Sequence, residues 1–125
     1  MRVARRHHLY YTVKHMARGD LVGSLEHMVL LALVHLGPNA YGMTVRREIE
    51  QRTGRDISIG AIYTTLQRLE NKGYVTSTVG EPTAERGGRA KRMFRLEADG
   101  RRALRASQTA IAQMSAGIQR HRSIR

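Results

Sequence analysis

The 125-residue sequence predicts a mainly α-helical protein that carries one small β-hairpin. Three observations lead to this fold class. Apolar residues recur at helical spacing in three successive segments between residues 25 and 72. Alternating, β-branched residues follow at 74–79, and helical spacing returns from about residue 98. Only six residues are aromatic, five Tyr and one Phe, so the core must be aliphatic, which favours packed helices over a large β-sandwich.

Charge is the strongest global property of the chain. It has 22 Lys and Arg against 10 Asp and Glu, a formal net charge of +12. A surface of this sign attracts polyanions, with nucleic acid first and anionic membrane second. Because the basic residues gather in a few segments, we expect a polyanionic partner rather than an evenly solvated surface.

Several function classes are excluded by composition. The absence of cysteine removes disulfides, zinc knuckles, iron–sulfur clusters and thiol nucleophiles. No HExxH, P-loop or G-x-S-x-G motif occurs, so we expect no enzyme, no cofactor and no metal; His27 and His35 are interpreted as core-edge histidines. The longest apolar run, Met28 to Val34, is far shorter than the roughly 20 residues of a membrane span. With no signal peptide recognised, we expect a cytoplasmic, nucleoid-associated protein.

A basic leader precedes the helical segments. In residues 1–22, Leu9, Tyr10, Val13 and Met16 fall at helical spacing. The leader therefore fits a short packing helix, a DNA-contacting arm or a frayed tail, of which the tail is the simplest. Its apolar face is too small to favour binding to an anionic membrane.

The first two helices are delimited by capping and breaking residues. Ser24 is expected to cap a helix over Leu25 to Leu36, which is apolar nearly all round and should lie in the middle of the domain. Gly37-Pro38-Asn39 ends it. A shorter helix is expected from about Tyr41 to Gln51, ended by Thr53-Gly54.

The third helix is the most informative segment. Ser58 is expected to cap it, and Lys72-Gly73 to close it. The apolar residues Ile59, Ile62, Leu66 and Leu69 fall on one stripe, and Glu70 lies beside that stripe. The opposite face is polar, slim and free of acidic residues; it consists of Gly60, Ala61, Thr64, Gln67, Arg68 and Asn71.

Such a face suits the DNA major groove, although an ordinary amphipathic surface helix would share part of the pattern. Gly60 and Ala61 would let the backbone approach closely. Thr64, Gln67 and Arg68 could reach base edges, while Tyr63, at the rim, is better placed for a phosphate.

A hairpin follows the third helix. Tyr74 to Val79 and Arg92 to Leu96 are expected to be its strands, joined by a turn-rich connection over 80–91. Four cations surround a Gly-Gly pair near its tip, where they could lie along phosphates or enter the minor groove. The DNA-contacting residues expected from helix and hairpin together are Ser58, Gly60, Ala61, Tyr63, Thr64, Gln67, Arg68, Arg86, Arg89 and Lys91.

A last helix is expected from about 98–100 to about Arg120. Leu104, Ser107, Ile111, Met114 and Ile118 are spaced alternately three and four residues apart, as in the seam of a coiled coil. This seam could pack back on its own domain. We favour a two-fold dimer through Leu104, Ile111, Met114 and Ile118, because Arg101, Arg102 and Arg105 disfavour a fully buried helix.

Three helices followed by a hairpin is the order of a winged helix-turn-helix, and the segment 23–104 resembles the PadR-type family of bacterial transcriptional regulators. The matching stretches are GSLEHMVLLALVHLG (23–37), AYGMTVRREIE (40–50), DISIGAIYTTLQRLENKGYV (56–75) and GGRAKRMFRLEADGRRAL (87–104), of which the third is the most specific. The resemblance covers about two thirds of the chain. It implies a C-terminal dimerisation helix, repression of nearby genes and a DNA-facing Tyr63. The family's usual aromatic pair in the second wing strand is here Met93-Phe94.

The resemblance also bears on the start of the chain and on ligands. Family members begin a few residues before the Gly-Ser-Leu-Glu motif, which makes Met16 the expected start and residues 1–15 an extension. Some PadR-like proteins bind flat lipophilic compounds in a Trp-lined pore at the dimer interface. This chain has no Trp, so a small-molecule effector is compatible with the family but unsupported by the sequence.

These observations together predict a DNA-binding regulator. We expect a basic extension (1–22), a winged helix-turn-helix domain (23–97) and a dimerisation helix with a basic tail (98–125). The expected function is sequence-specific binding of double-stranded DNA by a homodimer, as a repressor on a pseudo-palindromic operator. The alternative is a basic structural RNA-binding protein of the ribosome-associated kind, although such chains usually carry longer Lys/Arg runs.

Overall fold

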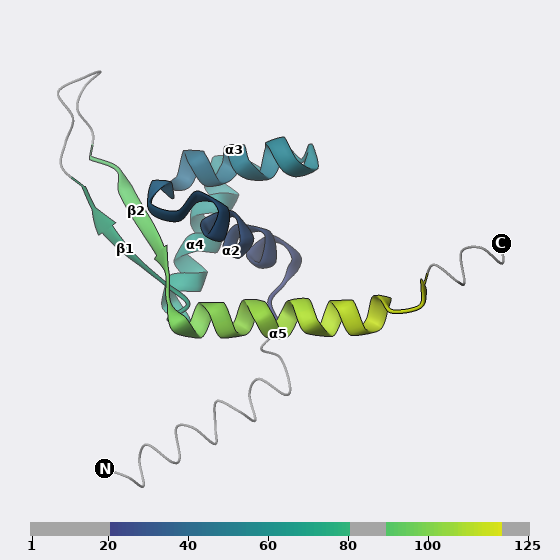
Figure 1. The fold of residues 1–125 in the computed structure, drawn as a ribbon. Coiled ribbons are helices and arrows are strands. Elements are labelled where there is room, and N and C mark those ends of the chain that lie inside the picture. The colour runs from purple at the N-terminus through teal and green to yellow at the C-terminus, as the bar shows by residue number, and fades with distance from the viewer. Residues whose placement is uncertain (1–20, 81–89, 119–125) are drawn as a thin grey trace, which may run out of the picture.

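The computed structural model describes residues 21–80 and 90–118 (Figure 1). Within these ranges the chain forms four α-helices, a single 3-10 turn and one two-stranded sheet. In chain order they are α2 (Ser24–Leu36), η1 (Gly37–Asn39), α3 (Gly42–Thr53), α4 (Ile59–Asn71), β1 (Val75–Val79), β2 (Arg92–Leu96) and α5 (Ala98–Ser115). This is the winged-helix order expected from the sequence. The expectations for the leader, for the Arg86 to Arg89 tip and for the C-terminal tail lie outside the described residues.

The boundaries of α2, α3 and α4 follow the sequence signals closely, with one error at the first cap. Helix α2 begins at Ser24 itself, and its N-cap is Gly23. The Gly23 N–H donates to Glu26 Oε1 at 3.2 Å, so a glutamate three residues on, rather than the serine hydroxyl, serves this terminus. Ser58 does cap α4 as expected, because its Oγ accepts the Ala61 N–H at 3.1 Å. Helix α3 runs to Thr53, two residues beyond its expected end, and stops at Gly54 with φ +74°.

The core lies where α2, α3 and α4 meet beneath the hairpin. Val29, Leu30, Val45, Ile62 and Leu66 are completely buried there. Burying an aliphatic side chain of this size contributes about 1.5–3 kcal/mol, so this cluster is the main stabilising element of the domain. Helix α2 occupies the centre, as its nearly continuous apolar sequence predicts, although Val34 near its end remains 48% exposed.

The hairpin is antiparallel and is anchored to the helices at its edge. Val75 pairs with Leu96 and Val79 with Arg92. Phe94 points into the core, and its N–H donates to the Ala40 carbonyl at 2.8 Å. Neighbouring Arg95 is exposed, which is the in–out alternation of a sheet with one covered face.

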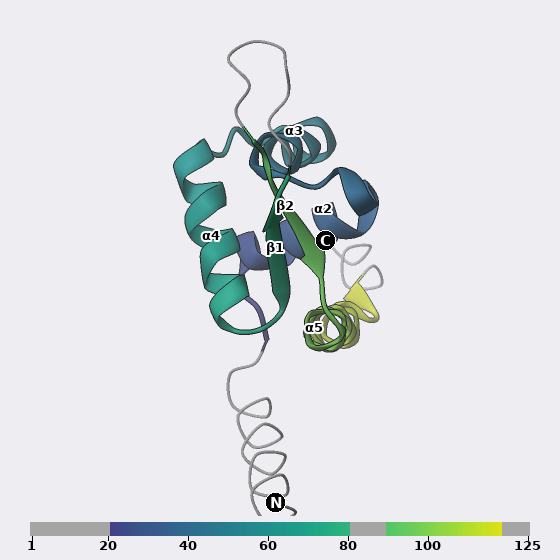
Figure 2. The ribbon, with the colours of Figure 1, turned by 90° about the vertical axis from the view of Figure 1, so that its left-hand side faces the viewer.

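Helix α5 runs along the base of the domain (Figures 1 and 2). Its first half is packed tightly: a Cβ added to Gly100 would lie 2.3 Å from the Tyr74 carbonyl oxygen and 2.8 Å from Leu96 Cδ1. Ser107 continues this contact, because its Oγ accepts the Val22 N–H at 3.0 Å. Only a glycine lets the helix approach the end of α4 and the hairpin this closely.

The second half of α5 departs from the expected seam. Leu104 is 5% exposed and belongs to the core of its own domain, so it offers little surface to a partner. Ile111 and Met114 are 59% and 82% exposed. The helix ends at Ser115, about five residues before the expected end, and Gly117 has φ +81°. Ile118 therefore lies beyond the helix rather than on its seam.

The close approach at Gly100 predicts that Gly100→Ala destabilises the domain. The added methyl group would collide with the backbone carbonyl of Tyr74 as well as with Leu96 Cδ1, and overpacking of this kind costs about 1–3 kcal/mol. Urea unfolding followed by circular dichroism would measure the change. Gly60→Ala is the matched control: a Cβ there has no neighbour within 4 Å, and the free energy of unfolding should stay equal or rise. An unchanged urea midpoint for Gly100→Ala would contradict this packing.

Candidate nucleic-acid interface

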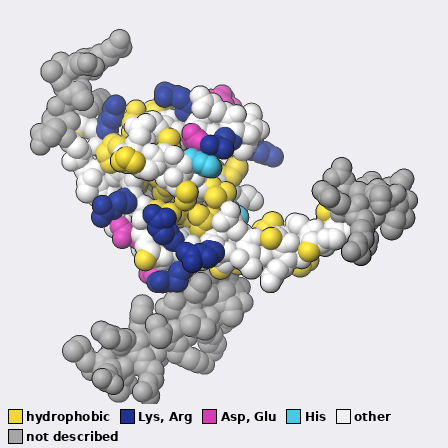
Figure 3. Space-filling model, in the orientation of Figure 1, with side chains coloured by type: hydrophobic (Ala, Val, Ile, Leu, Met, Phe, Trp, Pro, Cys, Tyr) yellow, Lys and Arg dark blue, Asp and Glu magenta, His cyan; other side chains and the backbone are white. Residues whose placement is uncertain are grey.

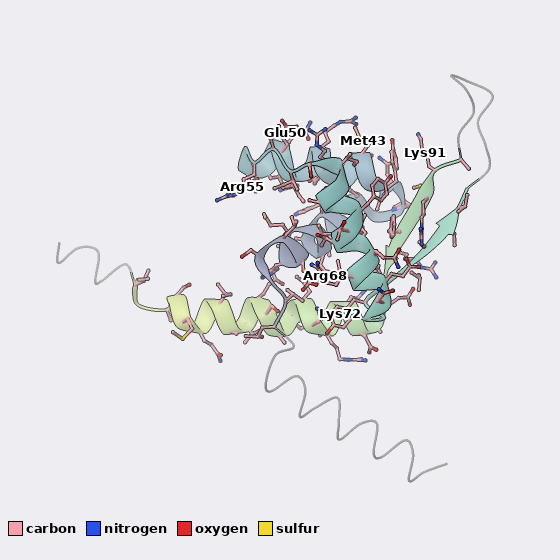
Figure 4. All side chains as sticks on the ribbon, turned by 180° about the vertical axis from the view of Figure 1, so that it is seen from behind. Met43, Glu50, Arg55, Arg68, Lys72 and Lys91 are labelled. Carbon is pink, nitrogen blue, oxygen red and sulfur yellow. The ribbon has the colours of Figure 1, made fainter. Side chains whose placement is uncertain are left out.

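The outer face of α4 is exposed as the sequence predicts. Of its apolar stripe, Ile62, Leu66 and Leu69 are completely buried, and Ile59 is half-buried. Ala61 is half-buried, and Figure 4 shows Arg68 on the outward side of the helix. The remaining expected residues of this face are all exposed: Ser58, Gly60, Tyr63, Thr64, Gln67 and Arg68. The fold therefore brings one slim, polar surface to the outside and partly covers only Ala61.

The one acidic residue of α4 is paired and directed away from this face. Glu70 Oε1 accepts from Arg92 Nη2 at 3.0 Å, and Glu70 Oε2 accepts from the Ser77 hydroxyl at 2.8 Å. Arg92 Nε in turn donates to Ser77 Oγ at 2.9 Å. This network neutralises the carboxylate and links the last turn of α4 to both strands of the hairpin.

A second ion pair holds the connection that leads into α4. Arg46 of α3 donates from Nη2 to Asp56 Oδ1 and from Nε to the Ile57 carbonyl, both at 2.7 Å. The carboxylate closest in sequence to the start of α4 is thereby neutralised, and the angle between α3 and α4 is supported. Sequence analysis missed this role of Arg46, because ten residues separate the two partners.

A third pair joins α4 to α2. Lys72 Nζ lies 3.1 Å from Glu26 Oε2, and the Glu26 side chain is only 8% exposed. The same carboxylate accepts the Gly23 N–H, so it serves the start of α2 and the end of α4 together. These partners offset part of the cost of burying the carboxylate.

Tyr63 lies over the first turn of α3. Gly42 is buried there, and a Cβ on it would lie 2.3 Å from Tyr63 Cζ. Tyr63 remains 42% exposed, and it lies at the edge of the α4 face that is next to α3. Sequence analysis gave Gly42 no role, because a glycine at the first position of a helix does not indicate contact with a tyrosine 21 residues further along the chain.

The hairpin stands beside α4, as Figure 2 shows. Lys91 is exposed at the end of β2 that leads to the tip, and its ammonium lies 4.6 Å from the centre of the Tyr41 ring. Lys91 Nζ also donates to Tyr41 Oη at 3.4 Å. Tyr41 was not among the expected site residues. Its partner Lys91 is, of the three hairpin cations expected to contact DNA, the one that lies in the described ranges.

Two other kinds of site have no support in the described ranges. Within 21–80 and 90–118, no group of three His, Asp or Glu side chains could hold a metal ion. In the same ranges no helix combines the length and the apolar character that crossing a bilayer requires. His27 is half-buried, with an Nε2 that has no hydrogen-bond partner there, and His35 lies 3.2 Å from Arg52 Nη2 at the surface.

Comparison with known proteins shows that the chain is similar to transcriptional regulators. Residues 30–106 match the family described as "Transcriptional regulator PadR-like family". A PadR family transcription regulator from Clostridium difficile R20291 superposes with a TM-score of 0.66 at 16% identity, covering 79% of this chain and 98% of that one. A PadR-like transcription factor from Bacteroides fragilis gives 0.66 at 22% identity, covering 87% and 97%.

A third structure is a complex with nucleic acid. Bacillus subtilis PadR in complex with operator DNA superposes with a TM-score of 0.56 at 20% identity, covering 66% of this chain and 45% of that one. At these identities the three structures share the fold with this chain. No curated protein sequence matches it.

Proposed function

Because the chain belongs to the transcriptional regulator PadR-like family, we propose that it regulates transcription by inserting α4 into the major groove of an operator. The observation that carries this proposal is the exposed face of α4, which is polar, narrow and free of unpaired negative charge. The operator complex of Bacillus subtilis PadR supports it as an analogy of fold.

The roles of the residues follow from their positions. Gly60 and Ala61 allow close approach of the backbone, and Thr64, Gln67 and Arg68 read base edges. Ser58 and Tyr63 contact the flanking phosphates at the two edges of the helix face. Lys91, together with Arg86 and Arg89 of the tip, contacts the phosphate backbone or the minor groove beside the hairpin.

The proposal includes a homodimer acting as a repressor. Ile111 and Met114 form an apolar patch at the end of α5, and Ile118 next to it is 51% exposed. Apolar side chains grouped in this way mark an interaction surface. A two-fold dimer whose two α4 helices lay about 34 Å apart would suit a pseudo-palindromic operator, and its occupation of a promoter would exclude polymerase.

The alternative, a structural RNA-binding protein, fits the geometry less well. A-form RNA has a deep, narrow major groove that a helix such as α4 cannot enter. The α4 face also lacks aromatic side chains other than Tyr63 for stacking single-stranded bases. Competition between duplex DNA and duplex RNA of the same sequence separates the two functions, and preference for RNA would overturn ours.

Arg68→Ala is expected to relax sequence preference. If Arg68 pairs with a base edge, its loss costs about 1–3 kcal/mol on the cognate duplex and little on a random one. The cognate sequence would first be selected from a random pool of duplexes, and both affinities then measured by fluorescence anisotropy. Arg105→Ala, which removes an equal charge from the exposed side of α5, is the control. Equal losses on both duplexes would exclude Arg68 as a base-reading residue.

Lys91→Ala and Arg89→Ala are expected to weaken binding to all sequences alike. Each lost phosphate contact should reduce the slope of log K against log salt by about 0.9. Affinities measured between low and physiological salt would give this slope, with Arg105→Ala again as the control. A slope identical to that of the wild type would remove the hairpin from the DNA interface.

Ile111→Asp or Met114→Asp is expected to give monomers, because a charge would be buried in the apolar contact between the protomers. Operator affinity should fall together with dimerisation. Sedimentation velocity at micromolar concentration would measure the assembly. Gln113→Asp, on another side of the same helix and already exposed, should remain dimeric. Dimers that survive both apolar substitutions would place the interface elsewhere.

A further inference from the structure

The exposed face of α4 differs in chemistry from the opposite face of the molecule. On that opposite face, which Figure 3 shows, many side chains are Lys or Arg, in dark blue, with acidic side chains, in magenta, among them. Two side chains in the middle of the α4 face are instead uncharged amides, Gln67 and Asn71. Both are exposed, and they lie one turn apart on the same side of the helix. They offer hydrogen-bonding groups to this surface without adding charge to it.

The two amides are hydrogen-bonded to each other. Gln67 Nε2 donates to Asn71 Oδ1 at 3.1 Å. This bond uses one of the two N–H groups of Gln67 and fixes the direction in which its amide points. Sequence analysis placed Asn71 on the outer face of the helix but not among the DNA-contacting residues, because spacing alone does not reveal a bond between two side chains.

The groups that remain free on Gln67 form a defined pattern. Within the described ranges this side chain makes no further hydrogen bond, so one acceptor, Oε1, and one N–H donor remain. Adenine presents the complementary pair in the major groove, an N6 donor beside an N7 acceptor. Guanine presents two acceptors there, O6 and N7, and would require two free donors. Gln67 bound to Asn71 therefore suits adenine better than guanine.

The surroundings of the pair leave it open to a base. The pair and three neighbours line one shallow hollow on this face: Tyr63, Thr64, Gln67, Arg68 and Asn71. The acidic residue of α4, Glu70, is bound by Arg92 and does not compete for these donors. Arg68 carries several N–H donors, which suit the two acceptors of guanine. The α4 face thus holds one group suited to each purine.

We propose that Asn71 is a positioning residue that makes Gln67 selective for adenine over guanine in the operator. This inference rests on the proposed function, because it assigns base selectivity to the helix that enters the major groove. Asn71 acts by holding one N–H of Gln67, so that one donor and one acceptor face the base. Without this bond the amide turns freely, and both of its N–H groups become available to a guanine.

Selection of duplexes from a random pool by the full chain gives the cognate sequence. The position read by Gln67 is the one at which Gln67→Ala loses its base preference, and Arg68→Ala identifies the position read by Arg68 in the same way. Fluorescence anisotropy then compares duplexes that carry adenine or guanine at the Gln67 position. We expect the wild type to prefer adenine about tenfold. Asn71→Ala should reduce this ratio about threefold or more, with no change at the Arg68 position.

Two further variants separate positioning from other effects. Asn71→Asp keeps an oxygen that accepts the Gln67 N–H, so the adenine preference should remain, while repulsion by the phosphates weakens binding to both duplexes. Asn71→Ala added to Gln67→Ala should change nothing further, because the residue that Asn71 positions is gone. Gln51→Ala, which removes an exposed amide from α3, is the control and should keep the wild-type ratio. Alanine favours the helix at all three positions, so each variant should fold.

Each result decides one part of the inference. An unchanged ratio in Asn71→Ala, or an equal reduction in Asn71→Ala and Asn71→Asp, would overturn the positioning role. A further change in the double variant would overturn it too, because Asn71 would then contact the base itself. A Gln67 position that selects guanine, or no position that responds to Gln67→Ala, would overturn the inference while the proposed function stands. A wild type that selects no duplex sequence would overturn the proposed function, and this inference with it.

Discussion

Neutralisation of the carboxylates around α4 is the constraint on which the rest of the structure depends. Three acidic side chains flank this helix, and each is bound by a cation: Glu26 by Lys72, Asp56 by Arg46 and Glu70 by Arg92. The two more exposed pairs contribute only about 0–1 kcal/mol each, and the desolvation of buried Glu26 offsets much of its attraction to Lys72, so the main effect of the three pairs is on position and potential rather than on stability. Each pair ties α4, or the link that enters it, to a different element. The helix is thus oriented by the same contacts that keep its outer face free of negative potential.

Close backbone approach completes this framework. At Gly100 helix α5 contacts the Tyr74 carbonyl just beyond α4, and at Gly42 helix α3 receives the ring of Tyr63. Both glycines lie within the first three residues of a helix, where the missing Cβ costs little helix propensity because the turn is only beginning. The hairpin is attached from both sides, through Glu70 to α4 and through the Phe94 N–H to the Ala40 carbonyl before α3. Helix and hairpin therefore form one continuous surface held by the body of the domain.

The sequence was sufficient to predict the helices and strands and to predict which face of α4 is exposed, because both depend on local periodicity. An apolar stripe three and four residues apart fixes which side of a helix is buried, and Arg68 on the opposite side had to be exposed. Contacts between distant residues could not be derived in this way: Tyr41 with Lys91 and Arg46 with Asp56 are known only once the chain is folded. The surface against which the three-four repeat of α5 packs could not be derived from the sequence for a related reason. A three-four repeat predicts burial but does not say against what, and Leu104 packs against its own domain.

The surroundings of helix α5 change at Ser107. Before this residue the helix faces its own core, and after it the apolar side chains face outward. A stable interface between two proteins usually buries about 1,200–2,000 Å² in total, which is more than Ile111, Met114 and Ile118 can supply alone. The segment that enters α2 lies beside α5 at this point, because the Val22 N–H binds Ser107, and the neighbouring Leu21 is 53% exposed. The proposed dimer would reach that size only if it also covered further apolar side chains, of which Leu21 is one candidate.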